Sequence, residues 1–135
     1  MIKAAELRKT ARARLADANA LLESRRYDAA VYICGYAVEI ALKARACRTL
    51  HWPRFPETAG EFRKDGLRSF QTHNLEVLLH LSGREQAVKL KAFADWSTVL
   101  GAWDPEARYK AVGAVDRQLA ADVISSAGAL IGILK

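Results

Sequence analysis

The sequence has few of the residues that build disulfide frameworks or metal sites. Of its 135 residues, two are cysteine and three are histidine. Cys34 and Cys47 are thirteen positions apart in one predicted helix, where they cannot face each other at disulfide distance. His51, four residues after Cys47, is an isolated match to zinc-ligand spacing. We therefore expect two buried, reduced thiols, no metal site and no cofactor.

Long apolar runs are also missing. No run approaches the roughly 18 residues that cross a bilayer as a helix. The N-terminal MIKAAELRKTARARL is basic and amphipathic, without the hydrophobic region or cleavage site of a signal peptide. With 51% apolar and 27% charged residues, the composition is that of a soluble globular protein. We expect one cytoplasmic domain over residues 1–135, with no membrane contact.

Acidic residues are in deficit. Fifteen Asp and Glu stand against 21 Lys and Arg, which gives a net charge of +6. Such an excess attracts anionic partners over long range. Charge alone does not distinguish RNA, a nucleotide, an acidic protein or a membrane surface.

No segment alternates with the period of two that is typical of strands, whereas several segments repeat with a helical period. The range Lys3–Glu23 predicts an amphipathic helix whose apolar stripe is Ala4, Leu7, Ala11, Leu15, Ala18 and Leu22. Arg8, Lys9 and Arg12 point away from that stripe. They form either a solvated face or, on a chain with surplus positive charge, a contact for phosphates.

The range Tyr27–Leu50 is apolar nearly all round in its first four turns, which predicts a helix buried at a bundle centre or between two protomers. Its polar stripe, spaced 4, 3, 4 and 4, is Asp28, Tyr32, Gly35, Glu39 and Lys43. The spacing of Glu39 and Lys43 suits an ion pair, and Gly35 permits close approach by another helix or a ligand. The alternative is an ordinary helix contact with one satisfied ion pair.

The range His51–Thr72 is predicted to be mostly loop, with a short helix after the capping box Thr58-x-x-Glu61. Basic residues alternate there with aromatic ones, a combination that suits phosphate contact plus base stacking. The aromatic side chains could equally anchor the loop to the core. With the adjoining helix end included, the basic residues are Arg45, Arg48, Arg54, Arg63, Lys64 and Arg68, and the aromatic ones are Trp52, Phe55, Phe62 and Phe70.

Helices make up the rest of the prediction. Thr72 caps a helix that ends at Ser82-Gly83, and a second runs from Arg84 to about Leu100. The second buries Ala87, Leu90, Phe93 and Trp96. Asp104-Pro105 starts a short turn that presents Arg108 and Tyr109, before a last helix over Val115–Leu134. The fold class is therefore all-α, an antiparallel bundle of four to five helices.

The order of these features resembles the HEPN family (higher eukaryotes and prokaryotes nucleotide-binding domain). The stretch YDAAVYICGYAVEIALKA is similar to the family's second helix, with Ala37, Glu39 and Lys43 in its A-x-E-x-x-x-K pattern. THNLEVLL resembles the family's Thr-His-Asp/Asn-Leu helix start, and ARYK precedes the last helix. The resemblance extends over about residues 5–134 and implies a HEPN-like bundle. The residues expected to bind nucleotide or RNA are Tyr32, Glu39, Lys43, Arg108 and Tyr109.

Catalytic branches of that family cleave RNA without metal, through an Arg-x4–6-His motif at the start of the last core helix that meets its copy across a dimer interface. Arg108 stands at this place, but the histidine positions hold Gly113, Ala114 and Val115. Arg68-x4-His73 and Arg45-x5-His51 match the spacing elsewhere in the chain. With thirteen arginines and three histidines, about one such match is expected by chance. His73 is expected in the first turn of its helix.

The leading hypothesis is a non-catalytic or weakly active HEPN-like module that dimerises through its central helices and binds nucleotide or RNA. The resemblance implies a partner chain such as a minimal nucleotidyltransferase. A second hypothesis is a metal-independent endoribonuclease, the toxin of a toxin–antitoxin pair, in which Arg68 stabilises the phosphate and His73 moves a proton. A third is a helical adaptor whose basic surface binds an acidic protein.

Overall fold

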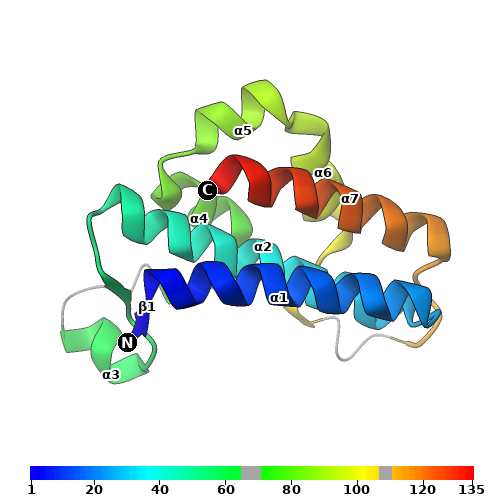
Figure 1. The fold of residues 1–135 in the computed structure, drawn as a ribbon, viewed down its shortest axis with the longest axis horizontal. Coiled ribbons are helices and arrows are strands. Elements are labelled where there is room, and N and C mark those ends of the chain that lie inside the picture. Colours follow the sequence, from blue (N-terminus) through cyan, green and yellow to red (C-terminus); the bar gives the residue numbers. More distant parts are fainter. Residues whose placement is uncertain (65–70, 107–110) are drawn as a thin grey trace.

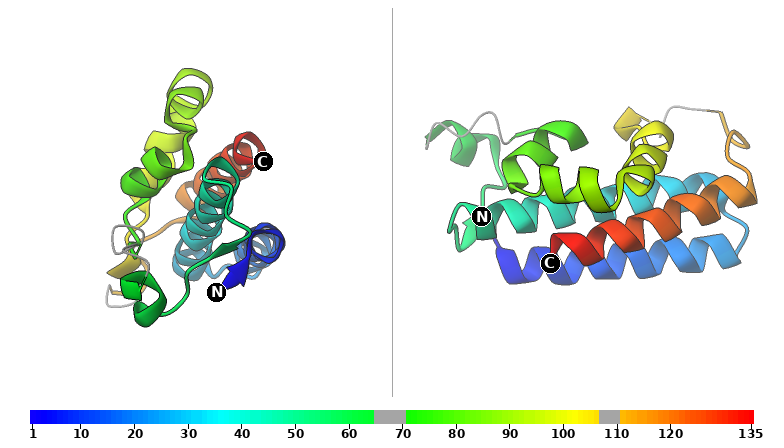
Figure 2. Two further views of the ribbon diagram at one scale, coloured as in Figure 1. Left: turned by 90° about the vertical axis from the view of Figure 1, so that its left-hand side faces the viewer. Right: turned by 90° about the horizontal axis from the view of Figure 1, so that it is seen from above.

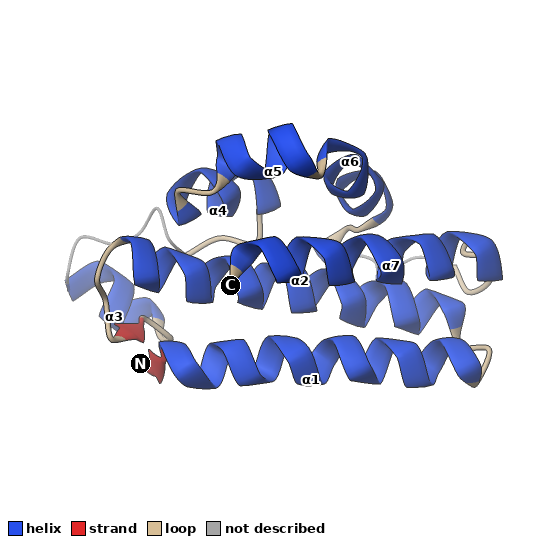
Figure 3. Ribbon diagram, turned by 45° about the horizontal axis from the view of Figure 1, so that its top comes forward, coloured by secondary structure: helices blue, strands red, loops and turns tan. Residues whose placement is uncertain are grey.

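The structure is a computed structural model that describes residues 1–64, 71–106 and 111–135. Within them it contains seven helices and one pair of two-residue strands, so the predicted all-α bundle is confirmed (Figures 1 and 3). The helices are α1 (Ala4–Glu23), α2 (Tyr27–Thr49), α3 (Ala59–Lys64), α4 (Leu75–Ser82), α5 (Glu85–Lys91), α6 (Phe93–Ala102) and α7 (Arg117–Leu134). The strands are β1 (Ile2–Lys3) and β2 (Arg54–Phe55).

The three long helices form the body of the molecule. α1 and α2 pack as an antiparallel hairpin, and α7 lies along both of them (Figure 1). The short helices α4, α5 and α6 cover the other side of α2 and α7 (Figure 2). β1 pairs antiparallel with β2, with Ile2 opposite Phe55, and so ties the start of the chain to the segment after α2.

α2 is the central helix, as its nearly continuous apolar surface predicted. Twelve of its residues are buried, and α1, α4 and α7 cover it. None of the large apolar side chains exposed in the described residues belongs to α2. Most of the apolar surface that suggested dimerisation through this helix is therefore covered within the chain, and Tyr32, Ile33, Tyr36 and Ile40 remain half-buried. Dimerisation stays a prediction.

Gly35 is the point of closest approach to α2. The indole ring of Trp103, which follows α6, occupies the space that a Cβ of Gly35 would fill. The indole nitrogen of Trp103 also donates to the backbone oxygen of Tyr32 at 3.0 Å. Gly35 thus accommodates a side chain of the same chain, and this contact fixes the end of α6 on α2.

The starts of the helices were predicted correctly at α3 and wrongly at α4 and α7. The capping box is present, because Glu61 N donates to Thr58 Oγ1 at 3.1 Å and Thr58 N donates to Glu61 Oε2 at 3.3 Å. At α4 the predicted cap was wrong: Asn74, not Thr72, accepts from the first-turn amides. His73 consequently lies before α4 and not in its first turn. α7 begins at Arg117, two residues after the predicted start, because Asp116 caps it.

The helix predicted from Arg84 to Leu100 is two helices, because the backbone breaks at Ala92, where φ is −146°. Its predicted buried face was wrong at two of four positions: Leu90 and Phe93 are 77% and 61% exposed, whereas Trp96 is buried as predicted and Ala87 is half-buried. The residues that face the core are Val88, Ala92, Trp96 and Val99. This set has helical spacing too, so the sequence contains two overlapping apolar stripes, and packing against α7 selects the second.

Both cysteines are buried free thiols, as predicted. Burial raises the pKa of Cys34 to about 12 and also raises the pKa of Cys47. α7 alone among the described helices is long and apolar enough to cross a membrane by length and composition. Its apolar side chains pack against α2 and α6, and core helices of soluble proteins meet the same criterion.

The contact of Trp103 with Gly35 gives the first prediction. Alanine normally stabilises a helix interior over glycine by about 0.5–1 kcal/mol. In Gly35→Ala the added methyl group overlaps the indole ring, so we expect a loss of about 1–3 kcal/mol and a lower Tm. Gly128→Ala in α7 is the matched control, because its Cβ would meet only Leu15 at 3.9 Å. Thermal unfolding that shows the two variants equally stabilised would contradict the contact.

Candidate functional site

Glu39, in the middle of α2, has a carboxylate that is 4% exposed and two charged partners. Its Oε1 lies 2.6 Å from Nδ1 of His73, and its Oε2 lies 3.6 Å from Nζ of Lys43. The ion pair expected from the spacing of Glu39 and Lys43 is therefore present. A buried carboxylate requires such partners, because it has lost most of its hydration.

The start of α4 holds His73 over α2. Thr72 Oγ1 accepts from Asn74 N at 3.0 Å, and Asn74 Oδ1 accepts from the amides of Glu76 and Val77. These bonds fix the backbone on either side of His73. The imidazole is 61% exposed although its Nδ1 is bound to a buried carboxylate. Within the described residues Nε2 has no hydrogen-bond partner, so this nitrogen is free to meet a ligand.

Aromatic rings extend this cluster along α2. The ring centroid of Tyr36 lies 6.2 Å from that of His73 and 5.2 Å from that of Trp103, both edge to face. Tyr32 continues the series, with its centroid 5.1 Å from Tyr36 and the two hydroxyl oxygens 3.5 Å apart. The arrangement gives Glu39 and His73 a packed, largely apolar side wall.

A groove of about 370 Å³ opens beside Lys43 and His73. Its volume lies in the range of small-molecule sites. Nζ of Lys43 lies 5.6 Å from the ring centroid of Phe55, at the groove's apolar wall. The groove therefore combines a cation, an imidazole, two hydroxyl groups and aromatic surface. Its lining residues are Ile2, Leu7, Thr10, Ile40, Lys43, Phe55, Pro56, Glu57, Phe62, Gln71, Thr72 and His73.

Asp28, the first member of the polar stripe, has a structural role. Its Oδ2 accepts from Gly113 N at 2.7 Å, and its Oδ1 accepts from Val115 N at 3.0 Å. It thereby holds the chain that leads into α7. A second cavity, of about 420 Å³, lies beside it, between the start of α2 and the end of α6.

The cluster supports two kinds of chemistry. Lys43 can contact an anionic oxygen, and an imidazole oriented by a carboxylate can accept or donate a proton. A metal would need more ligands, since no three His, Cys, Asp or Glu side chains come together in the residues described. Glu39 and His73 supply only two.

The structure brings Tyr32, Glu39, Lys43 and His73 into this one cluster. Arg68, Arg108 and Tyr109 lie outside the described residues. The other motif match does not form a pair: Nη1 of Arg45 donates to Lys135 O at 2.8 Å, and His51 is exposed in the turn after α2.

Two neighbours of the cluster were not among the predicted site residues. Tyr36 follows Gly35 in α2, and Trp103 precedes the Asp104-Pro105 turn. No local pattern distinguishes these aromatic residues from ordinary core residues. They belong to the cluster only because the chain brings residues 67 positions apart into contact.

Comparison with known proteins found one family: the model of the HEPN domain matches residues 4–59. This range covers α1, α2 and β2 and so includes Tyr32, Glu39 and Lys43, whereas His73 lies beyond it. Neither the curated proteins nor the solved structures contain a match.

The bond between His73 and Glu39 gives the second prediction. His73→Ala removes a partner of a buried carboxylate, so we expect a loss of about 1 kcal/mol of unfolding free energy, limited by water entering the vacated space. His80→Ala is the matched control, because the Nδ1 of His80 pairs at 3.4 Å with Glu85, which is itself 39% exposed. The control should change stability by less than about 0.5 kcal/mol. If chemical denaturation shows equal losses of unfolding free energy in the two variants, the contact of His73 with Glu39 contributes nothing to stability.

Proposed function

We propose, because residues 4–59 match the model of the HEPN domain, that this protein binds a nucleotide or RNA in the groove beside Glu39, Lys43 and His73. The observation that carries the proposal is the position of the buried Glu39 carboxylate. It holds an ammonium on one side and an imidazole on the other, and both line the groove.

Lys43 is suited to contact a phosphate. Its Nζ lies 3.6 Å from Glu39, longer than the 2.7–2.9 Å of a strong charge-assisted hydrogen bond. The ammonium therefore keeps donors for a ligand, while Glu39 and the ring of Phe55 limit its positions. Its side chain is 18% exposed, so a contact made there is only partly screened by water.

The remaining lining suits the rest of a nucleotide. Thr10 and Thr72 bring hydroxyl groups to the groove, which can bond to a sugar or a base edge. Phe55 and Phe62, whose ring centroids are 5.9 Å apart, form an apolar wall. Both rings are buried, at 3% and 5% exposed, so they give a base or sugar an apolar contact and no free ring on which to stack. Such a contact favours no particular sequence.

The proposal includes a homodimer in the cytoplasm and a partner chain, either a minimal nucleotidyltransferase or an antitoxin. The resemblance to HEPN proteins supports both. Most apolar side chains of α2 are covered, so that helix offers such contacts only its half-buried residues Tyr32, Ile33, Tyr36 and Ile40.

Lys43→Gln tests the binding site and is the third prediction. Loss of a charge-assisted contact of about 1.5–3 kcal/mol should weaken binding of a nucleoside triphosphate or a short RNA about ten- to a hundredfold. Lys89→Gln is closely matched, because Lys89 also pairs with a glutamate four residues earlier, at 3.2 Å, but lies on α5. Fluorescence anisotropy should show near-wild-type binding for the control. The same affinity in both variants would exclude the groove.

RNA cleavage is the second candidate function, and the 2.6 Å contact of Glu39 with His73 favours it. A carboxylate that fixes an exposed imidazole is an arrangement found where histidine transfers protons. In this reading His73 Nε2 moves the proton and Arg68 stabilises the phosphate. The position of Arg68 lies outside the described residues.

A nuclease assay in EDTA separates the two functions and is the fourth prediction. We expect the wild type to bind RNA and leave it intact. If the protein is a ribonuclease, wild type and His80→Ala cleave RNA, whereas His73→Ala loses about a hundred- to ten-thousandfold in rate and retains binding. That pattern would replace the binding proposal with a catalytic one.

A further inference from the structure

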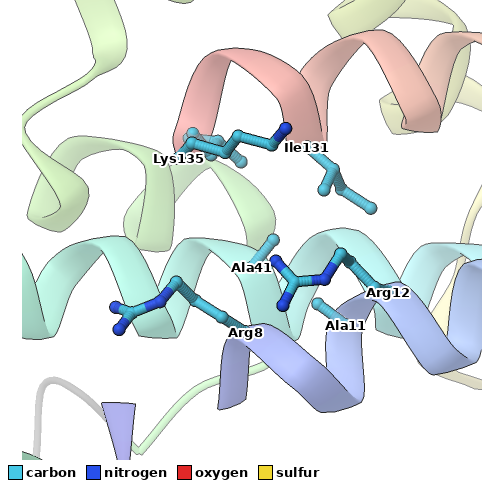
Figure 4. Close-up of a pocket in the computed structure, with 7 residues that line it drawn as sticks. Arg8, Ala11, Arg12, Ala41, Ile131 and Lys135 are labelled. Atoms are coloured by element: carbon cyan, nitrogen blue, oxygen red, sulfur yellow. The ribbon is translucent and has the colours of Figure 1, made fainter. Parts of the chain in front are cut away.

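Five arginines from three parts of the chain gather where α7 ends. Arg8 and Arg12 of α1 line a small hollow together with Lys135, and Figure 4 shows Lys135 across from them. Arg45 of α2 and Arg84, between α4 and α5, bond to the last carbonyls of α7, those of Lys135 and Ile133. We call Arg8, Arg12, Arg45, Arg48 and Arg84 the arginine cluster.

Lys135 links the two halves of the cluster. It lines the hollow with Arg8 and Arg12, and its backbone oxygen accepts from Nη1 of Arg45 at 2.8 Å. The pKa of Arg45 is lowered, first by desolvation and then by repulsion from Arg84 and Arg48, as expected where like charges lie near one another.

No Asp or Glu side chain in the described part of the chain pairs with this charge. None of the ion pairs among the described residues involves an arginine of the cluster, and the hollow has no acidic residue in its lining. Arg45 and Arg84 have a structural role, since cations stabilise the carbonyl end of a helix. Within the described residues Arg8, Arg12 and Arg48 have no such partner, and they are exposed. Arg8 and Arg12 are like charges four residues apart on α1, which an anionic ligand would neutralise.

The shape of the region indicates what kind of anion fits. The hollow has a volume of only about 20 Å³, too small to enclose a base or a sugar. Positive charge spread over an open surface suits the phosphates of a polymer that passes across it.

α1 connects the cluster to the groove of the proposed function. Leu7 and Thr10 line the groove, and Arg8, Ala11 and Arg12 line the hollow, so the two sites flank the same turns of α1, on either side of its buried contact with α2. A helix with its side chains is about 10–12 Å across. Phosphates on the two faces therefore belong to different nucleotides of one strand.

We propose that the arginine cluster binds the backbone phosphates of a single-stranded RNA that crosses the N-terminal half of α1 into the groove beside His73. This inference rests on the proposed function and narrows it, because it makes the ligand an RNA strand instead of a mononucleotide. The groove takes one nucleotide, and the cluster supplies sequence-independent affinity.

The fifth prediction measures the number of phosphate contacts. Binding of single strands falls with salt with a slope of about −0.7 per phosphate contact on logarithmic axes. The double variant Arg8→Gln/Arg12→Gln should therefore lose about 1.4 from the slope for an oligouridylate of about 12 nucleotides. Its affinity for uridine triphosphate should stay at the wild-type value.

The control is Arg26→Gln/Arg117→Gln, which lowers the net charge equally. Arg26 precedes α2 and Arg117 opens α7, so both lie at the opposite end of the bundle from the cluster (Figure 1). All four side chains are exposed, and thermal melts should show folded variants. If the salt dependence of binding falls equally in the two double variants, the inference is overturned. That result would show that the net charge of the protein attracts RNA without a defined site. A wild type that binds the triphosphate but no oligonucleotide would overturn the inference too.

Lys43→Gln in the same salt series separates this inference from the proposed function. If Lys43→Gln leaves affinity unchanged while Arg8→Gln/Arg12→Gln lowers the salt slope, the proposal that the groove binds a nucleotide is wrong. Phosphate binding by the arginine cluster is then still supported. If only Lys43→Gln weakens binding, the groove binds the ligand and the proposed role of the arginine cluster is overturned.

Discussion

The burial of Glu39 is the constraint on which the arrangement of the second half of the chain depends. α2 is otherwise a core helix, and a carboxylate that is 4% exposed within it costs several kcal/mol unless its charge is matched. Lys43 lies on the same helix, so it can neutralise the charge of Glu39 in any fold that contains α2. His73 reaches Glu39 only when the segment before α4 lies across α2. The carboxylate therefore favours the docking of α4 as well as the chemistry of the site.

The rest of the polar stripe of α2 acts in the same way. Asp28 binds the segment that leads into α7, the Tyr32 carbonyl accepts from Trp103, and Gly35 makes room for its ring. Each of these partners lies beyond residue 59, where the HEPN match ends. One face of a helix inside the matched region thus sets where the later segments sit.

The difference between contacts within α2 and contacts with later segments explains what the sequence could predict. The helices, the stripe and the ion pair of Glu39 and Lys43 follow from spacings of three and four residues, which report directly on one helix. The partners of the stripe are 34 to 87 residues away, and no local period encodes such contacts. Two competing apolar stripes likewise made the buried face of α5 and α6 undecidable without α7. Asn74 and Thr72 were both acceptable caps, and only the position of the preceding chain selects Asn74.

Glu39 also sets the terms on which the groove can bind an anion. Its negative charge opposes a phosphate near His73 and offsets part of the charge of Lys43, so the groove alone has little net attraction for RNA. The arginine cluster has the opposite character, because its charge has no Asp or Glu partner among the described residues. In the proposed mode of RNA binding, the groove orients one nucleotide and the cluster attracts the phosphates of the strand. The Glu39 carboxylate is then tolerable beside the groove, because the attraction that it removes would come from the cluster on the other flank of α1.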